Sequence, residues 1–266
     1  MVLGAVITDG VIVQRLTNSI WVGLDCVLNK SQIADVAGVF WALKMSLGKL
    51  KSYYESVNLT GDQPAGSRYF PSITAYSDGN ELVEFEYIGF LEDGPDCITL
   101  CAKTRTVPSR DIVVKFVDRY GERAHRLLAD ADLVPKLLYY GSPHLKDNQP
   151  SYHSISMVVM EYVDGITLAE AKRTMDKGTI EKVRSEIGRA LRLLHKNGFV
   201  YGDLRPPNVM ITKAVKVKLI DFNWPGEEGQ AKYPSLMSKG IAWSEGVEAV
   251  AVMMREHDID MLSKLF

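Results

Sequence analysis

Three side chains in the last third of the sequence carry oxygen atoms suited to metal and proton chemistry: Asp203, Asn208 and Asp221. Four residues separate Asp203 from Asn208. Two short runs with β-branched residues, 209–211 and 217–220, follow Asn208 and lead to Asp221, which predicts a hairpin between the amide and the second acid. The pattern therefore predicts that all three side chains lie together at one end of this hairpin.

These residue types suit phosphoryl transfer. One carboxylate can accept or orient the proton of a hydroxyl group, while the second carboxylate and the amide oxygen hold Mg²⁺, a hard cation that prefers oxygen ligands. The alternative is a chance hairpin whose acids are merely solvated. The spacing, the order of the residues and the flanking strands all favour the first interpretation.

The segments Asp203-Leu-Arg-Pro-Pro-Asn208 and Asp221-Phe-Asn223 give the sequence a resemblance to the protein-kinase superfamily. In that superfamily the catalytic loop is an Asp, four residues and an Asn, and the metal-binding acid opens a DFG triplet. The resemblance covers about residues 80–225. It implies that Asp203 orients the acceptor hydroxyl and that Asn208 and Asp221 hold Mg²⁺.

Two cations complete the phosphate site that the resemblance implies. Arg205 occupies a place where Ser/Thr kinases have a lysine, and it could meet the terminal phosphate and neutralise developing charge. Lys115 lies within an apolar strand predicted at 111–117, where an isolated ammonium would be costly. The resemblance makes Lys115 the lysine that pairs with the α- and β-phosphates. The alternative is that its side chain snorkels to the edge of the sheet.

The resemblance also requires a glutamate that holds this lysine and a linker that holds adenine. Glu122 opens a short predicted helix and is the candidate partner of the lysine, the alternative being a charge that only favours the helix N-terminus. Residues 160–163 form the candidate linker. Its main chain at Glu161 and Val163 would bond adenine, and Met160 would close the back of the pocket. ATP and Mg²⁺ are thus the expected cofactors.

The resemblance implies an α+β fold with two kinase-like lobes, and hydrophobic periodicity predicts its helices. Residues 1–79 are expected to form a hairpin-plus-helix extension, in which Asp9-Gly10 turns the hairpin and an apolar helix face runs from about 31 to 54. Residues 80–163 are expected to form the strand-rich N-lobe, and residues 164–266 a reduced C-lobe. The helices predicted in the C-lobe are 168–177, 179–196 and 244–265.

The composition is that of an ordinary globular protein: 266 residues, 46% hydrophobic and 24% charged, with a formal net charge of −2. This charge argues against a general surface for nucleic acids or anionic membranes. Three cysteines are too few, and odd in number, for a disulfide framework. The sequence shows no basic signal-peptide region and no long uncharged apolar run, so an intracellular location is expected.

Several departures from the family pattern affect the interpretation. The catalytic triplet is Tyr201-Gly202-Asp203, and the first two predicted strands offer only Gly89 and Gly94 in place of a glycine-rich phosphate loop. Asn223 replaces the DFG glycine, and a left-handed conformation is expected there. Only residues 224–266 follow the metal acid. Short C-lobes of this kind resemble the RIO, lipopolysaccharide-kinase and Crinkler-type kinase branches, of which the fungal Crinkler type looks nearest.

The resemblance as a whole implies an ATP- and Mg²⁺-dependent phosphotransferase that acts on a hydroxyl group, expected to be a serine or threonine of a protein. Two alternatives stay open. A small-molecule kinase would show a compact acidic or aromatic acceptor pocket in place of an open groove, and a pseudokinase would bind partners without turnover. The missing glycine loop and Asn223 favour the pseudokinase, whereas the complete set of metal and phosphate residues favours an enzyme.

Overall fold

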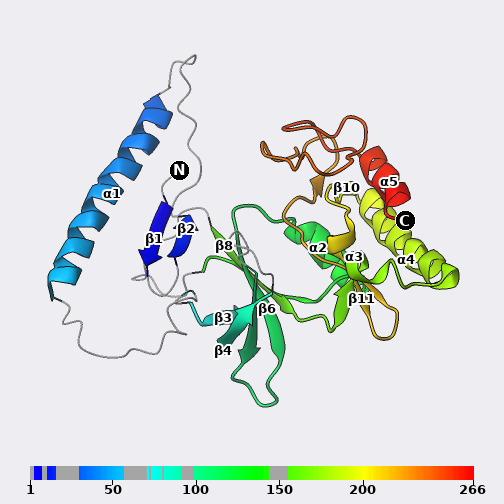
Figure 1. Ribbon diagram of the computed structural model, residues 1–266, viewed down its shortest axis with the longest axis horizontal. Helices are drawn as coiled ribbons and strands as arrows, with labels where there is room; N and C mark the ends of the chain where they lie inside the picture. The colour runs from blue at the N-terminus through cyan, green and yellow to red at the C-terminus, as the bar shows by residue number, and fades with distance from the viewer. Residues whose placement is uncertain are drawn as a thin grey trace. The chain divides into compact units, whose positions relative to one another are not determined.

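The computed structural model describes residues 3–7, 11–15, 30–56, 71, 73–79, 81–91, 99–143 and 155–266 (Figure 1). The chain forms two compact units, Met1–Tyr69 and Phe70–Phe266. The domain boundaries expected after residues 79 and 163 stay predictions.

The first unit contains the predicted hairpin and helix. Strand β1 (Leu3–Ile7) pairs antiparallel with β2 (Val11–Arg15), and Ile7 lies opposite Val11. The Asp9-Gly10 turn itself lies outside the described residues. Helix α1 (Lys30–Ser56) covers the helix predicted at 31–54. Its large apolar side chains are exposed within the described structure, namely Ile33, Phe40, Trp41, Met45, Leu47, Leu50, Tyr53 and Tyr54.

The strand-rich part of the second unit is one antiparallel sheet with the strand order β3-β4-β5-β6-β8-β7. The strands are β3 (Ala75–Asp78), β4 (Glu81–Phe90), β5 (Thr99–Thr104), β6 (Asp111–Val117), β7 (Leu137–Gly141) and β8 (Ser156–Glu161). One face of the sheet buries Phe85, Leu100 and Ile112, and the other buries Val113, Val158 and Met160. Strand β3 was not predicted, because its sequence Ala-Tyr-Ser-Asp holds no β-branched residue.

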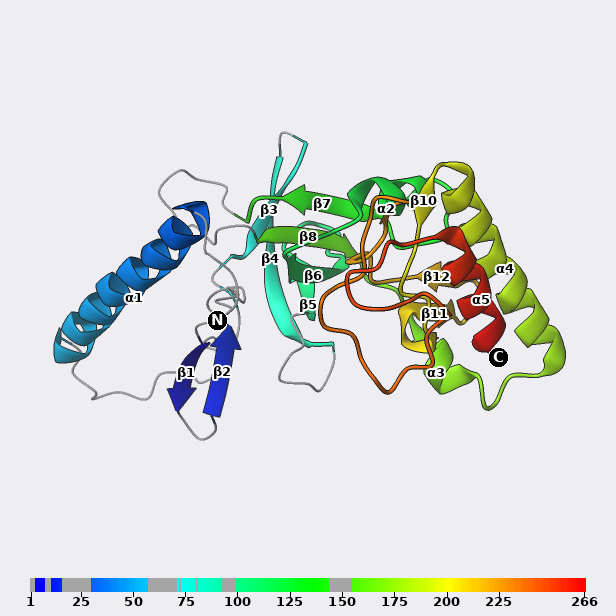
Figure 2. The same cartoon turned by 90° about the horizontal axis from the view of Figure 1, so that it is seen from above.

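The rest of the second unit is mainly helical. Its elements are α2 (Glu122–Ala129), β9 (Gly165–Thr167), α3 (Leu168–Ala171), α4 (Lys177–Lys196), β10 (Phe199–Val200), η2 (Pro206–Asn208), β11 (Val209–Thr212), β12 (Val217–Leu219), β13 (Gly226–Glu227) and α5 (Arg255–Lys264). Helices α4 and α5 lie side by side in both views (Figures 1 and 2). Buried side chains of α2, α4, α5 and the β11–β12 hairpin share one core, which therefore supports the loop between β10 and β11.

Two helix predictions in this region are wrong in extent. The helix expected at 168–177 ends at Ala171. The next helix, α4, begins at Lys177, because the Asp176 side chain caps it by accepting a hydrogen bond from the Thr179 amide. The helix expected at 244–265 begins at Arg255, because Gly246 and Val250 have φ angles of +81° and +58°, which a right-handed helix cannot accommodate. Among the described residues, no helix has the length and apolarity needed to cross a membrane.

Candidate active site

The predicted hairpin is present and brings the trio together. Strands β11 and β12 pair antiparallel with Val209 opposite Leu219. The Ile220 amide donates a hydrogen bond to the Asn208 carbonyl at 2.9 Å, next to Asp221. The loop that begins at Asp203 and the turn at Asp221 therefore meet at one end of the hairpin, as the sequence pattern predicted.

Asp203 is a buried carboxylate held by two donors. The Asn208 Nδ2 group donates to the Asp203 backbone oxygen at 2.9 Å and to Oδ2 at 2.8 Å. The Arg205 guanidinium grips the same carboxylate in a fork, with Nε 2.5 Å from Oδ1 and Nη2 2.8 Å from Oδ2. Burial raises the pKa of Asp203 above its ordinary value, and the hydrogen bonds and charge of Arg205 act in the opposite direction.

Asp221 has a left-handed backbone, with φ +65°. Its Oδ1 atom accepts from Lys115 Nζ at 3.1 Å and from the Asn223 amide at 3.3 Å. Lys115 is only 8% exposed, so this ion pair, rather than snorkelling, compensates its charge. A residue with a side chain in this conformation is strained, and such strain is common at functional sites.

The predicted ion pair between Lys115 and Glu122 is wrong for this structure. Glu122 Oε1 instead accepts from Arg126 Nε at 2.9 Å on the surface of α2. The reason is the orientation of the helix: its buried residues are Ala124, His125 and Leu128, and Glu122 lies off that face. Asp221, and not Glu122, is the ion-pair partner of Lys115.

The residue of α2 that packs against the turn at Asp221 is His125. The His125 ring stacks on Phe222, with centroids 4.6 Å apart. Tyr201 packs edge-on against the Phe222 ring, with centroids 5.5 Å apart. The two ring nitrogens of His125 are bonded to Tyr120 Oη at 2.5 Å and to the Pro135 carbonyl at 2.7 Å. Burial lowers the pKa of His125 to about 4, so the ring is neutral near pH 7 and serves packing.

Asp258 of α5 anchors the loop that begins at Tyr201 and leads to Asp203. Asp258 was not singled out from the sequence. The amides of Tyr201 and Gly202 donate to its two carboxylate oxygens, each at 2.8 Å, and His195 Nε2 lies 2.9 Å from Oδ2. Asp258 is 1% exposed and shares the inner stripe of α5 with Met261. The sequence signal for this role was an acid that shares a helix face with the apolar Met261. A carboxylate buried in this way requires hydrogen-bond partners.

The local structure explains why glycine is the middle residue of the Tyr201-Gly202-Asp203 triplet. The φ of Gly202 is +77°, and a Cβ atom there would lie 1.7 Å from Met253 Cε. The backbone conformation therefore favours glycine, and any larger residue would also have to displace the end of the Met253 side chain.

Asn223 does not have the left-handed conformation expected of it. In the described residues the positive φ of this turn belongs to Asp221. The Asn223 carbonyl accepts from Arg119 Nε at 3.1 Å, and its side-chain Oδ1 is buried with no hydrogen-bond partner in the described structure. The turn thus forms without the conformational freedom that a glycine at this position would provide.

The candidate adenine linker follows β8. Met160 is 4% exposed and lies opposite Val113 in the sheet. The Glu161 amide donates to the Lys136 carbonyl at 3.0 Å, and Val163 follows in an extended, half-buried segment. Their roles toward adenine stay predictions. Residues 92–98, which include Gly94 of the expected phosphate loop, lie outside the described residues.

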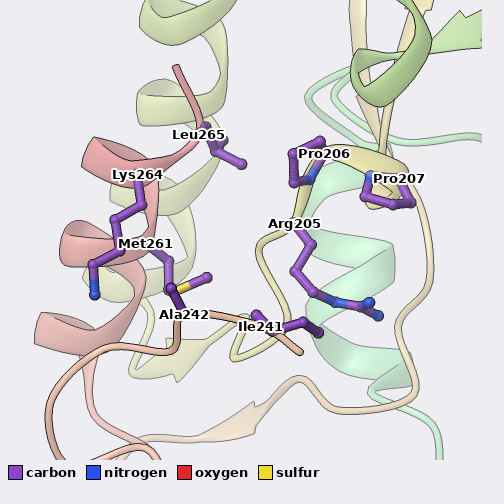
Figure 3. A pocket seen from close by; sticks show the side chains of 8 residues that line it. All are labelled: Arg205, Pro206, Pro207, Ile241, Ala242, Met261, Lys264 and Leu265. Carbon is purple, nitrogen blue, oxygen red and sulfur yellow. The ribbon is translucent and has the colours of Figure 1, made fainter. Parts of the chain in front are cut away.

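A cavity of 260 Å³ adjoins the catalytic loop (Figure 3). Its walls are Arg205, Pro206, Pro207, Ile241, Ala242, Met261, Lys264 and Leu265. The Arg205 guanidinium also lies over the ring of Trp243, 6.0 Å from its centroid. Apart from two cationic side chains the lining is apolar.

The free oxygen atoms of the site fit Mg²⁺. Asn208 uses its amide nitrogen on Asp203, so its Oδ1 stays available as a ligand. Asp221 uses Oδ1 on Lys115 and Asn223, and no bond within the described residues occupies its Oδ2. Carboxylate and amide oxygens are ligands that Mg²⁺ accepts together with phosphate oxygens.

Comparisons with known proteins agree with this geometry. The family model described as the protein kinase domain matches residues 144–238. Human serine/threonine-protein kinase ULK1 is 26% identical over 198 residues, which are 67% of this chain and 18% of that protein. A probable cAMP-dependent protein kinase catalytic subunit of Encephalitozoon cuniculi is 27% identical over 161 residues, 58% of this chain and 50% of the relative.

Shorter and structural matches point the same way. Serine/threonine-protein kinase PknB of Mycobacterium tuberculosis is 38% identical over 68 residues, 24% of this chain and 11% of that kinase. The chain thus spans half or less of each of these curated relatives. The solved structure of the Cydia pomonella granulovirus kinase PK-1 superposes with a TM-score of 0.52 at 17% identity, over 67% of this chain and 65% of that one. The chain therefore has a protein-kinase-like fold, and residues 144–238 match the protein kinase domain.

Proposed function

We propose that this chain is an ATP- and Mg²⁺-dependent phosphotransferase that acts on a serine or threonine hydroxyl of a protein. The observation that carries the proposal is the convergence of Asp203, Asn208 and Asp221, with Lys115 bound to the last of them. Transferring a phosphoryl group requires positioning and charge neutralisation more than covalent chemistry, and this set of groups suits both.

In this proposal each group has one role. Asn208 Oδ1 and Asp221 hold Mg²⁺, which neutralises charge on the phosphates. Lys115 shares its ammonium between Asp221 and the α- and β-phosphates, because its Nζ already lies beside the metal acid. Asp203 orients the acceptor hydroxyl.

Arg205 is compatible with that last role. A carboxylate oxygen can accept two hydrogen bonds. Among the described residues Oδ1 of Asp203 accepts only from Arg205 Nε, so one lone pair stays free for a hydroxyl group. The guanidinium, fixed beside that hydroxyl, can stabilise the negative charge of the phosphoryl group in transit.

A second candidate function is a nucleotide-binding module without turnover. Two departures from the family pattern favour it: Asn223 stands in place of the DFG glycine, and the sequence has no glycine-rich phosphate loop. A small-molecule acceptor is a third outcome of the test, which the cavity beside Arg205 does not favour, because its lining holds no acidic or aromatic side chain. The attribution to the Crinkler-type branch belongs to the proposal too, and its support is the Tyr201-Gly202-Asp203 triplet with Asn223.

Transfer of the γ-phosphate of labelled ATP tests the proposal. We expect the wild-type chain with Mg²⁺ to label a generic protein substrate, and Asp203→Asn to lose most of that rate while still binding nucleotide. Asp111→Asn is the matched control, because the side chain of this acid is exposed and its ion pair is with the exposed Lys103. Nucleotide binding without label on any acceptor would favour the pseudokinase, and label on small hydroxyl compounds alone would move the acceptor to that class.

A further inference from the structure

Arg119 joins two separate stretches of the segment that follows Asp221. It lies between β6 and α2, in the strand-rich half of the second unit. Its Nε and Nη2 groups donate to the carbonyls of Asn223 and Trp224 at 3.1 and 2.6 Å. Its Nη1 group donates to the carbonyl of Lys232 at 2.7 Å. One guanidinium thus binds three backbone oxygens, two from residues 223–224 and one from residue 232.

Neighbours of Arg119 hold the residues just before these. The Gly121 amide donates to the Phe222 carbonyl at 2.7 Å, and Lys115 binds the Asp221 carboxylate. Four consecutive residues, 221–224, are therefore each bonded to the short stretch 115–121. The approach is close: a Cβ atom on Gly121 would lie 2.5 Å from the Pro225 carbonyl oxygen.

We infer that Arg119 is a positioning residue for the metal site, a role that rests on the proposed function. By fixing the carbonyls of Asn223 and Trp224, it keeps the strained turn closed, with Asp221 facing Asn208. Kinase activation loops can be ordered by a phosphate that pairs with arginine. Here the arginine binds neutral carbonyls, so the turn is held without any modification of the chain.

The shape of the side chain matters for this role. The planar fork of arginine presents five N–H donors in fixed directions, whereas lysine is a compact charge with one donor atom. Lysine at position 119 could reach one of the two stretches but could not span both. Glutamine would remove the charge and offer two N–H donors on one atom in place of the five of the guanidinium.

The first measurement is amide hydrogen exchange on the full-length protein without nucleotide. We expect Arg119→Gln to speed exchange in peptides covering 221–232 at least tenfold and to leave helix α4 unchanged. Arg119→Lys should fall between Arg119→Gln and the wild type, and phosphatase treatment should change nothing. Arg126→Gln is the control, because its partner Glu122 lies on the surface of the neighbouring helix. Unchanged exchange at 221–232, or equal acceleration throughout the second unit, would overturn the inference.

The second measurement is the Mg²⁺ concentration that gives half-maximal binding of a fluorescent ATP analogue. We expect Arg119→Gln to raise it about tenfold, with nucleotide binding in the absence of metal unchanged and with partial rescue in Arg119→Lys. An unchanged Mg²⁺ requirement beside faster exchange would reduce Arg119 to a structural contact and contradict the positioning role. If the wild type binds no nucleotide, the proposed function fails, whereas the exchange result still decides whether Arg119 holds the turn.

Discussion

Asp258→Ala should be the most damaging change to the C-terminal half of the kinase-like unit. The carboxylate accepts the buried amides of Tyr201 and Gly202 at 2.8 Å each and meets His195 at 2.9 Å. Alanine leaves both amides without an acceptor. Because an unsatisfied buried donor costs about 1–3 kcal/mol, the free energy of unfolding should fall by about 2–6 kcal/mol.

Asp258→Asn separates this reasoning from a simple loss of volume. The amide keeps the shape and one acceptor oxygen, but its nitrogen must face a donor. The expected loss in the free energy of unfolding is therefore that of one unsatisfied amide, about 1–3 kcal/mol. Glu256→Ala, on the same helix, removes an exposed acid and should leave stability near that of the wild type.

Urea denaturation of the full-length chain, followed by circular dichroism, measures these differences. Phosphoryl transfer by the same variants should fall as well, since the loop that carries Asp203 loses its anchor. If Asp258→Ala unfolded within about 1 kcal/mol of the wild type, the two amides would have other partners and the anchoring role would be wrong.

Four further predictions concern the loop and the turn. Gly202→Ala should lose on the order of 1–3 kcal/mol in thermal denaturation, because alanine is strained at φ +77° and its Cβ would strike Met253; an unchanged Tm would contradict this. Burial raises the pKa of Asp203, and the base acts deprotonated, so the rate should fall on acidification at a higher pH than an ordinary aspartate would give. Arg205→Gln should move this acidic limb of the rate–pH profile further up, since Arg205 opposes the shift. Asn223→Gly should change turnover only modestly, because Asn223 is not left-handed; activity that appears only in the glycine variant would refute the enzyme assignment.

Local patterns in the sequence were sufficient for much of the site. The spacing of Asp203 and Asn208, and the β-branched runs before Asp221, specify a loop and a hairpin whose partners are near in sequence. Helices α1 and α4 were predictable for a similar reason, since their apolar periodicity is long and uninterrupted.

Long-range partners could not be read in this way. Lys115 and Asp221 are 106 residues apart, and the choice between Asp221 and Glu122 depends on how α2 is rotated, which its own sequence does not fix. The bonds of Arg119 end on backbone carbonyls, which have no sequence signature. The shortened α5 depends on positive φ angles that only the packing of the preceding loop imposes.

The dependence of phosphoryl transfer on Mg²⁺ in the wild type and in Asp221→Ala tests the central claim most directly. The initial rate of label transfer from ATP is measured across a Mg²⁺ titration, with circular dichroism to show that the variant is folded. We expect the wild-type rate to rise and saturate with Mg²⁺, and the rate of Asp221→Ala to fall at least about a hundredfold at every concentration, because the metal loses its carboxylate ligand. A variant with near wild-type turnover and the same Mg²⁺ dependence would contradict the metal assignment and, with it, this account of the site.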